Sequence, residues 1–547
     1  MVLRRGGRCI VLFIVLAVAA VFTVGMAFAS DEAKGHRAPG QFDLEQARAE
    51  RQMLHDRLSR EMPVGTSEQR VRVVVSDEER AQIADSDEWR LRVGIVKTLG
   101  VPPIIFDASP AGIHGSHGSR TVGVTDGSVW AVTLESPGAT AVRLHFTDFD
   151  LAPGAKLYLH TERGEAFGPY TNRGPLGTGE FWSHTIAGDT VTVQTSNSGR
   201  GRSWFTIPDI GYMDLTKVHG NPTPDPQTGE QLCSFNANCV ENANCNSIPP
   251  AIQSARDAMA HMEFVSGAFL YYCSGGLLAD TDSSSQIPYF LTANHCLSSN
   301  KVASSLQAFF QYEVACNGTC PTLYFYNQEP PPYPRTLGAT VKSSNSGGDY
   351  TLLQLSEAAP SGSFFLGWTS TPVANSNGTA LYRISHPGGA PQAYSTHSVD
   401  TSAPTCSSWP RGERIYSRDT LGATEGGSSG SPVLNSSGQA VGQLSGACGF
   451  NVNDVCDSTA NATVDGALAY YWSSVAPFLD PAGGCTVTEN PEVSCSDGVD
   501  NDCDGATDSN DSDCFGGSCT PAGQLCTANS ECCSNSCKGK PGAKKCK

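Results

Sequence analysis

Three short motifs carry the residue types that nucleophilic catalysis uses. Residues 427–432, Gly-Ser-Ser-Gly-Ser-Pro, place Ser429 on a glycine-flanked turn, where backbone N–H groups can converge on the oxygen of a tetrahedral intermediate. His295 ends the apolar stretch 289–291 and precedes a cysteine, and Asp349 begins an apolar strand pattern. Alone, each motif also fits an ordinary turn, a surface histidine or a strand cap. In the order His, Asp, Ser they indicate an acyl-transfer site.

The residues of these motifs resemble those of the chymotrypsin-like (trypsin-fold) serine peptidases, which carry T-A-x-H-C, an aspartate before an apolar strand, and G-x-S-G-x-P. More specifically, it resembles the secreted bacterial lysyl endopeptidases. The resemblance covers about Cys233 to Asp480, and the shared segments are 290–296, 349–355, 427–432 and 442–444. It implies a double β-barrel peptidase domain.

The resemblance also implies a role for each site residue. His295 would act as general base and then general acid, Asp349 would orient it, and Ser429 would form the acyl-enzyme. The backbone N–H groups of Gly427 and Ser429 would form the oxyanion hole. Ser445 would support Asp349 and, with Gly446, begin the edge on which a peptide adds as an antiparallel strand.

The substrate pocket departs from the pattern of the family. Trypsin-like members carry an acid six residues before the serine, where this sequence has Ala423, and lysyl endopeptidases carry one at the position of Thr463. Asp465, Asp457 and Asp454 lie nearby, but solvated loop aspartates are the commoner interpretation. We therefore do not predict lysine specificity, and the preference for the residue before the scissile bond (P1) stays open.

Composition limits the elements that can position these residues. A chain of 547 residues suggests about three or four domains, and 57 glycines with 33 prolines favour short strands and turns, hence a mostly β fold. The 54 acidic against 36 basic residues disfavour nucleic acid and anionic lipid as partners.

The N-terminus predicts export. Arginines precede an apolar run and Ala27-Phe28-Ala29, which is typical of a signal peptide over residues 1–29, with an uncleaved membrane anchor as the alternative. No later segment is apolar enough to span a membrane. We expect a secreted, extracellular or cell-surface protein.

Residues 30–220 contain no cysteine and predict a propeptide. A helical pattern over 42–60 precedes period-two alternation, as in Val142 and Leu144 against Arg143, which indicates a β-sandwich. A proline-rich linker follows. Residues 221–482 form the predicted peptidase domain, with helical patterns over 252–264 and 469–479.

Twenty cysteines remain after the signal peptide, an even number that favours disulfides in an exported chain over zinc. Ten lie in the peptidase domain. The family resemblance implies a Cys273–Cys296 bond and, less directly, Cys233–Cys448 and Cys239–Cys316. Four cysteines stay unassigned in this domain: Cys245, Cys320, Cys406 and Cys456.

Residues 483–514 contain an acidic loop with the oxygen-ligand spacing of a Ca²⁺ site and Gly505 at its turn. It resembles the D-G-x-D-N-D-C-D-G repeats of bacterial surface proteins and thrombospondin type 3 loops. A disordered acidic linker is the alternative. The predicted metal ligands are Asp500, Asp502, Asp504, Asp508 and Asp511.

Residues 515–547 have the cysteine spacing of an inhibitor cystine knot. That resemblance implies the bonds Cys519–Cys533, Cys526–Cys537 and Cys532–Cys546, which a chain this short needs for stability. Its five lysines against Glu531 suggest a cell-surface or polysaccharide ligand, and an inert stabilising cap is equally consistent.

Together these features predict a secreted serine endopeptidase made as a zymogen, a monomer that acts on proteins or peptides and needs no cofactor for catalysis. One alternative is a catalytically silent binding protein that uses the peptidase fold and the knottin-like tail. A second is a protease inhibitor that acts through the knot.

Overall fold

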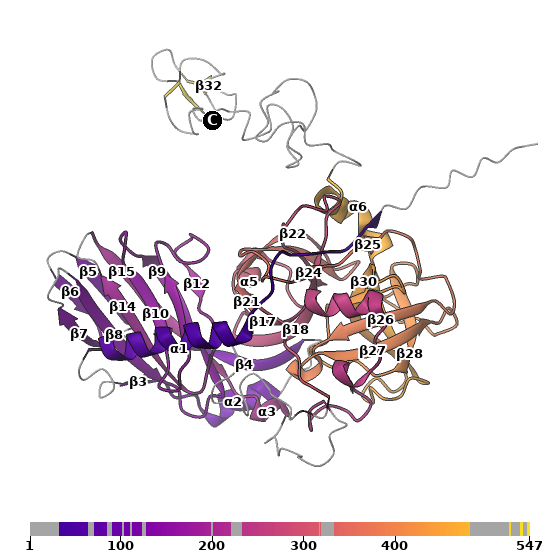
Figure 1. The fold of residues 1–547 in the computed structure, drawn as a ribbon, viewed down its shortest axis with the longest axis horizontal. Helices are drawn as coiled ribbons and strands as arrows, with labels where there is room; N and C mark the ends of the chain where they lie inside the picture. Colours follow the sequence, from indigo (N-terminus) through magenta and orange to yellow (C-terminus); the bar gives the residue numbers. More distant parts are fainter. Residues whose placement is uncertain are drawn as a thin grey trace, which may run out of the picture. The chain divides into compact units, whose positions relative to one another are not determined.

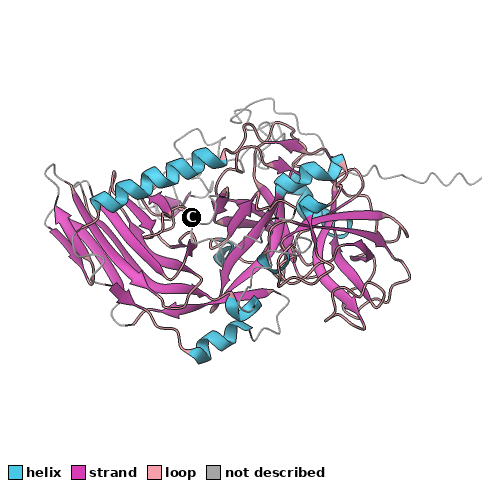
Figure 2. Cartoon of the chain, turned by 60° about the horizontal axis from the view of Figure 1, so that its bottom comes forward, coloured by secondary structure: helices cyan, strands magenta, loops and turns pink. Residues whose placement is uncertain are grey.

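The structure is a computed structural model of the chain. It describes residues 32–63, 70–84, 90–100, 103–109, 112–122, 127–197, 201–219, 232–316, 318, 333–481, 525, 526, 537–539 and 544–546. The predicted signal peptide, the acidic repeat 483–514 and most of the tail 515–547 therefore lie outside the described residues. Strands dominate the rest, as Figure 2 shows, in agreement with the predicted mostly β fold.

The leading region, residues 32–219, is a β-sandwich with helices at its periphery (Figure 1). Its core is apolar residues from both sheets, such as Val132 and Leu144. One sheet contains β3 (Arg70–Arg72), β7 (Ser119–Val122), β8 (Ser128–Glu135), β10 (Lys156–His160), β11 (Ala166–Tyr170) and β14 (Thr190–Asn197). The other contains β4 (Leu91–Thr98), β5 (Ile104–Ser109), β6 (Gly112–Gly115), β9 (Ala141–Asp150), β12 (Phe181–Trp182), β13 (Ile186–Ala187) and β15 (Ser203–Met213).

The helices of this region are α1 (Leu44–Glu61), α2 (Asp77–Ala84) and α3 (Thr216–His219). Helix α1 matches the predicted helical lead, and Asp43 caps it by accepting hydrogen bonds from the N–H groups of Glu45 and Gln46. Before it, β1 (Glu32–Ala33) and β2 (His36–Arg37) pair with strands of the following region.

Residues 232–481 form the double-barrel region, which contains two rings of strands. The first barrel consists of β17 (Met259–Ser266), β18 (Phe269–Leu278), β19 (Tyr289–Ala293), β23 (Tyr350–Leu355), β22 (Ala339–Asn345), β21 (Arg335–Leu337) and β20 (Gln307–Phe310). Gly338 joins β21 to β22, which completes the ring. The second consists of β26 (Ala380–Ser385), β27 (Ala393–Val399), β28 (Arg414–Leu421), β31 (Asn461–Ala467), β30 (Ala440–Gly449) and β29 (Pro432–Leu434).

Short elements complete this region: β16 (Glu241–Asn242), β24 (Phe364–Phe365), β25 (Trp368–Thr369), α4 (Pro250–Gln253), α5 (Asn300–Ala303), α6 (Leu468–Leu479) and the 3-10 turns Ala243–Cys245, Ser254–Ala258 and Pro387–Gly389. In the tail, β32 (Cys537–Lys538) pairs with β33 (Lys545–Cys546). Within the described ranges, no helix has the length and apolar character that crossing a bilayer requires.

Two features of the sequence pattern were misleading. The helix predicted over 252–264 is wrong from Met259 onward, because those residues form β17, whose side chains are buried on both faces and so show no alternation. Arg143 alternates with Val142 and Leu144, a pattern typical of a solvent-facing side chain, yet it is wholly buried because the double-barrel region covers its side of β9.

The disulfides also correct the sequence analysis. Cys448 bonds to Cys406 rather than to Cys233, and Cys239 bonds to Cys456 rather than to Cys316. Cys316 bonds instead to one of the unassigned cysteines, Cys245. A disulfide needs Cα atoms about 4.4–6.8 Å apart, and the order of cysteines along the chain cannot supply that distance.

Candidate active site

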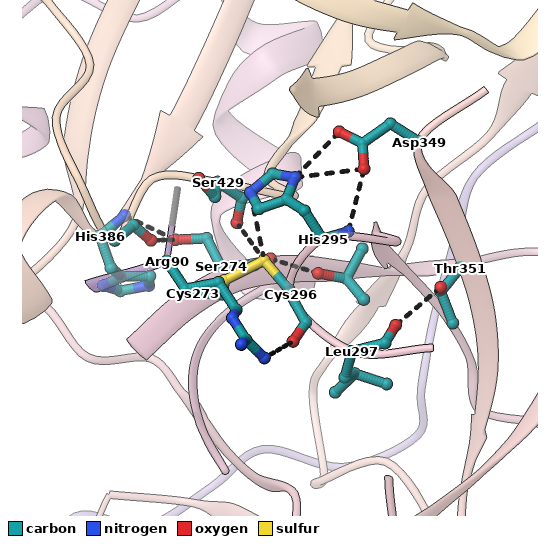
Figure 3. Close-up of a disulfide and its surroundings, with 12 residues drawn as sticks. Arg90, Cys273, Ser274, His295, Cys296, Leu297, Asp349, Thr351, His386 and Ser429 are labelled. Carbon is teal, nitrogen blue, oxygen red and sulfur yellow. Dashed lines mark hydrogen bonds and ion pairs between the residues drawn. A yellow bond between two sulfur atoms is a disulfide. The ribbon is translucent and has the colours of Figure 1, made fainter. Parts of the chain in front are cut away.

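The three candidate catalytic residues lie where the two barrels meet. His295 follows β19 and Asp349 immediately precedes β23, so both come from neighbouring strands of the first barrel. Ser429 lies in the turn before β29 of the second barrel. Figure 3 shows the Ser429 side chain beside the His295 ring, with Asp349 on the other side of that ring.

The Asp349 carboxylate holds His295 in one orientation. His295 Nδ1 lies 2.9 Å from Asp349 Oδ2 and 3.2 Å from Oδ1, and the His295 backbone N–H donates to Oδ1 at 2.9 Å. The two side chains are only 18% and 11% exposed, so little water competes for these bonds. With Nδ1 protonated toward the carboxylate, Nε2 is left as the proton acceptor.

Ser429 is buried, and its backbone carbonyl accepts a hydrogen bond of 2.8 Å from the Ser274 N–H. Among the described residues, no hydrogen bond joins Ser429 Oγ to His295 Nε2. Such bonds are often long before substrate binds and shorten in the reactive complex. The structure thus brings the three residues together with the His–Asp contact formed and the His–Ser contact open.

The turn that carries Ser429 aims two backbone N–H groups in a fixed direction. The Gly426 carbonyl accepts from the Gly388 N–H at 2.7 Å, and the Ser428 carbonyl accepts from the Ser431 N–H at 3.1 Å. Because C=O and N–H point opposite ways across a trans peptide, the N–H groups of Gly427 and Ser429 point away from these partners. The oxyanion hole at Gly427 and Ser429 stays a prediction with which this geometry is compatible.

Gly427 also shows why this turn needs glycine. Its φ is +98°, and an added Cβ would lie 2.9 Å from the His386 carbonyl oxygen. Ser274 Oγ donates to the Gly427 carbonyl at 2.8 Å and accepts from the His386 N–H at 3.0 Å. That donor is the backbone N–H of His386; burial lowers the pKa of the His386 imidazole to about 4, so the ring beside this turn is uncharged at neutral pH.

Asp349 is held in a conformation that the sequence analysis did not explain. Its φ is +51°, which non-glycine residues seldom adopt, and Gln443 of β30 fastens it from the other barrel. Gln443 Nε2 donates to the Asp349 carbonyl at 2.8 Å and to the Gly348 carbonyl at 3.3 Å. Tyr471 of α6 donates its hydroxyl to Gln443 Oε1 at 2.5 Å.

Gln443 is thus a site residue that sequence reasoning missed, although the segment 442–444 was part of the family resemblance. The expected support from Ser445 is not found. Ser445 Oγ is buried and has no hydrogen-bond partner among the described residues. The only available signal for Gln443 was a polar side chain in an otherwise apolar strand pattern.

The disulfide predicted beside the histidine is present. Cys273, in the middle of β18, bonds to Cys296, which directly follows His295 (Figure 3). Possible ligand atoms of Cys273, His295 and Cys296 lie within 4.8 Å of one another. This group does not suit a metal, since both sulfurs are in the disulfide and neither is a thiolate.

One of the positions implied for substrate specificity, Thr463, contacts a partly buried acid. Ala423 and Thr463 are both nearly inaccessible, and Thr463 Oγ1 donates to Asp419 Oδ1 at 2.7 Å. His397 Nδ1 lies 2.7 Å from the same oxygen. Burial would raise the pKa of Asp419, but the hydrogen bonds from His397 and Thr463 outweigh it and hold that pKa below its usual value.

Asp465 is not the solvated loop aspartate that was the commoner expectation. It is wholly buried and pairs with the buried Arg383 at 2.5 Å, inside the second barrel. Arg383 also donates to the Ser431 carbonyl at 2.8 Å, so the pair braces the turn after the candidate nucleophile. Asp454, by contrast, is exposed as expected.

Of the predicted cystine knot, the Cys526–Cys537 bond is present. The other two predicted pairs involve Cys519, Cys532 and Cys533, which lie outside the described residues, as do all five predicted calcium ligands, Asp500 to Asp511.

Comparison with known proteins places these observations in context. Residues 230–460 match a family model described as the lysyl endopeptidase C-terminal domain. A lysyl endopeptidase of Pseudomonas aeruginosa is 30% identical over 272 residues, which cover 49% of this chain and 56% of that protein. The chain therefore spans about half the length of this curated relative.

Solved structures give more distant matches. An inactive form of the Rv3671c protease is 14% identical with a TM-score of 0.27, over 42% of this chain and 91% of that chain. An HtrA-type protease, AlgW with a tripeptide, is 15% identical with a TM-score of 0.27, over 41% and 62%. The finding that relates the site to known peptidases is therefore the sequence match. Residues 230–460, which contain the three candidate catalytic residues, are similar to a lysyl endopeptidase domain.

Proposed function

We propose that the chain is a serine endopeptidase in which Ser429 attacks the peptide carbonyl. The observation that carries this proposal is the His295–Asp349 contact, which leaves Nε2 of the imidazole directed to the Ser429 side. The similarity of residues 230–460 to a lysyl endopeptidase domain supports it independently.

The chemistry follows from the geometry. His295 Nε2 takes the proton of Ser429 Oγ as this oxygen bonds to the carbonyl carbon, and Asp349 stabilises the imidazolium. The N–H groups of Gly427 and Ser429 stabilise the oxyanion. The imidazolium then protonates the leaving amine, the C–N bond breaks, and water releases the acyl group from Ser429 by the reverse sequence.

Replacement of the nucleophile tests the proposal. Ser429→Ala should abolish amide hydrolysis and labelling by a serine-directed phosphonate. Ser437→Ala, in an exposed turn of the same barrel, is the matched control and should keep both. Full activity in the Ser429 variant would refute the assignment, and a folded protein that never labels would favour the silent binding protein.

We further propose that the P1 pocket prefers a basic side chain and that Asp419 supplies the charge. The lysyl endopeptidase name of the relative agrees with such a preference. Thr463 is uncharged, but its hydroxyl contacts Asp419 directly. Arg383 and Asp465 neutralise one another nearby, which leaves the carboxylate of Asp419 as the net charge behind Thr463.

This part of the proposal has its own test. Asp419→Asn should lower kcat/KM for peptides with lysine or arginine at P1 by about tenfold or more relative to apolar P1 residues, because a buried charge loses its partner. Asp454→Asn in the exposed loop should leave the ratio unchanged. An unchanged ratio in the Asp419 variant would remove Asp419 from the pocket.

The remaining features complete the proposal. Residues 1–29 direct export, and the leading region acts as a propeptide. The acidic loop at Asp500–Asp511 binds Ca²⁺, and the tail attaches the enzyme to a cell surface or polysaccharide. The mature enzyme acts as a monomer.

A further inference from the structure

Strand β4 of the leading region extends the first barrel at the edge of β18. The pairing is antiparallel, with Leu91 opposite Tyr272 and Ile95 opposite Phe269. β18 continues from Tyr272 into Cys273, whose disulfide partner follows His295. The paired edge therefore ends at the candidate catalytic residues, and the N-terminal end of β4 is the end nearest to them.

Side chains at that end of β4 contact the site itself. The Arg90 guanidinium lies 4.0 Å from the centre of the Tyr271 ring, and its Nη1 donates to the Cys296 carbonyl at 3.4 Å (Figure 3). Leu91 covers Gly426, since a Cβ added to Gly426 would lie 3.9 Å from Leu91 Cβ. Residues 90 and 91 thus lie between the disulfide and the oxyanion turn.

β4 runs along β18 in the direction that the chain of a bound peptide substrate would take. On the proposed function, the acyl half of a peptide pairs with β30 at Ser445 and Gly446, on the second barrel. The leaving-group half then continues along the first barrel, away from Ser429. β4 runs in this sense, from Leu91 beside the site to Ile95 farther along β18.

We propose that residues Arg90–Ile95 inhibit the enzyme by occupying the leaving-group side of its peptide groove as an added strand. This inference rests on the proposed function and specifies how the leading region regulates it. A peptide substrate cannot pair with β18 while β4 does, because one strand edge accepts one partner.

The contact beyond β4 is extensive enough to outlast cleavage of the chain. Apolar residues of both regions form one cluster: Val93, Ala141, Ala187, Met213 and Leu215 with Val265, Leu270, Tyr272, Phe309 and Tyr312. The wholly buried Arg143 and Glu263 face one another across it at 3.7 Å, and Arg143 donates to the Ser305 carbonyl at 2.9 Å. A cut between His219 and Cys233 alone would therefore leave the inhibitor bound.

The test uses the full chain with a recognition sequence for a site-specific protease inserted within residues 220–231. After cutting, the two parts should co-elute in gel filtration, and hydrolysis of a peptide that spans both sides of the scissile bond should stay blocked. The cut Arg90→Ala/Leu91→Gly variant should hydrolyse it at least about tenfold faster, as expected for loss of a ring contact and a hydrogen bond. Cut Arg202→Ala, which loses an exposed arginine immediately before β15, should match the cut parent.

The outcomes separate this inference from the proposed function. Phosphonate labelling of Ser429 in each cut form reports whether the enzyme is competent. If the cut parent hydrolyses the long peptide as fast as the Arg90/Leu91 variant, with Ser429 labelled in both, the inhibition by β4 is refuted while the peptidase stands. If Ser429 labels in none of them, the proposed function fails and the inference fails with it.

Discussion

Gln443 should control catalysis through the position of Asp349. Its amide nitrogen binds the carbonyls of Gly348 and Asp349, and its oxygen accepts the Tyr471 hydroxyl. All of these groups are buried, and Gln443 lies on a different barrel from Asp349. Gln443→Met keeps the shape of the side chain but removes both donors and the acceptor.

The magnitude follows from these bonds. The Asp349 carbonyl retains the Asn294 N–H at 3.0 Å, so the change leaves chiefly the Gly348 carbonyl and the Tyr471 hydroxyl without their partner. At about 1–3 kcal/mol for each such group, unfolding should require about 3 kcal/mol less. Asp349 then loses the hydrogen bond from Gln443 that helps to hold its backbone at φ +51°. A resulting shift of about 1 Å in its carboxylate should lower kcat about 100-fold with little change in KM.

The assay compares kcat and KM of Gln443→Met with those of the parent and of Tyr471→Phe, each after the leading region has been removed. Tyr471→Phe keeps both bonds to the 348–349 backbone and removes only the outer hydroxyl, so it should lose stability but keep most of its kcat. Urea unfolding supplies the stability of each variant. A Gln443→Met enzyme that loses stability but keeps kcat within twofold would show that the residue only stabilises the fold.

Three further predictions concern other parts of the chain. Removing the Cys273–Cys296 bond with a double alanine variant should cost about 3 kcal/mol in urea unfolding, since the bond closes a loop with a sequence separation of 23; a loss below about 1 kcal/mol would contradict this. Burial lowers the pKa of His386 to about 4 in the folded protein, against about 6.5 in the unfolded chain. The neutral imidazole therefore contributes its full share to the free energy of unfolding above pH 6.5, and this share falls by about 1.4 kcal/mol per pH unit toward pH 4. Unfolding midpoints should fall over that pH range, and less steeply in His386→Gln. Ca²⁺ titrated into the metal-free full chain should bind by calorimetry, and Asp504→Asn should weaken that binding at least tenfold, whereas equal binding by both would exclude the acidic loop.

The candidate catalytic residues could be picked out from the sequence because each lies in a short contiguous motif whose local conformation is encoded nearby. Glycines flank Ser429, an apolar strand leads to His295, and another follows Asp349. Their meeting, however, depends on two barrels closing, and only the family resemblance supplied that. The sandwich of the leading region followed from period-two alternation, which is a property of single strands.

What could not be predicted involves partners far apart in the sequence. Gln443 and Asp349 are 94 residues apart, and the pair is specified by strand register in two barrels rather than by any local pattern. Cys239 and Cys456 are 217 residues apart, and the pairing of Cys239 that the family resemblance implied was wrong. Arg143 looked like a solvent-facing residue because the alternation on β9 does not indicate that a second domain covers that face.

One strand links the proposed inhibition to the proposed catalysis. β18 passes through Cys273, whose disulfide holds the segment of His295, and its edge at Tyr271 and Tyr272 pairs with β4. A change that weakens the edge for the inhibitor therefore weakens it equally for the leaving-group half of a substrate. Arg90 and Leu91 escape this constraint because they belong to the inhibitor alone. Selection for tighter or looser inhibition can act on those two residues without cost to the enzyme, which is why the decisive variants lie in the leading region rather than in the barrels.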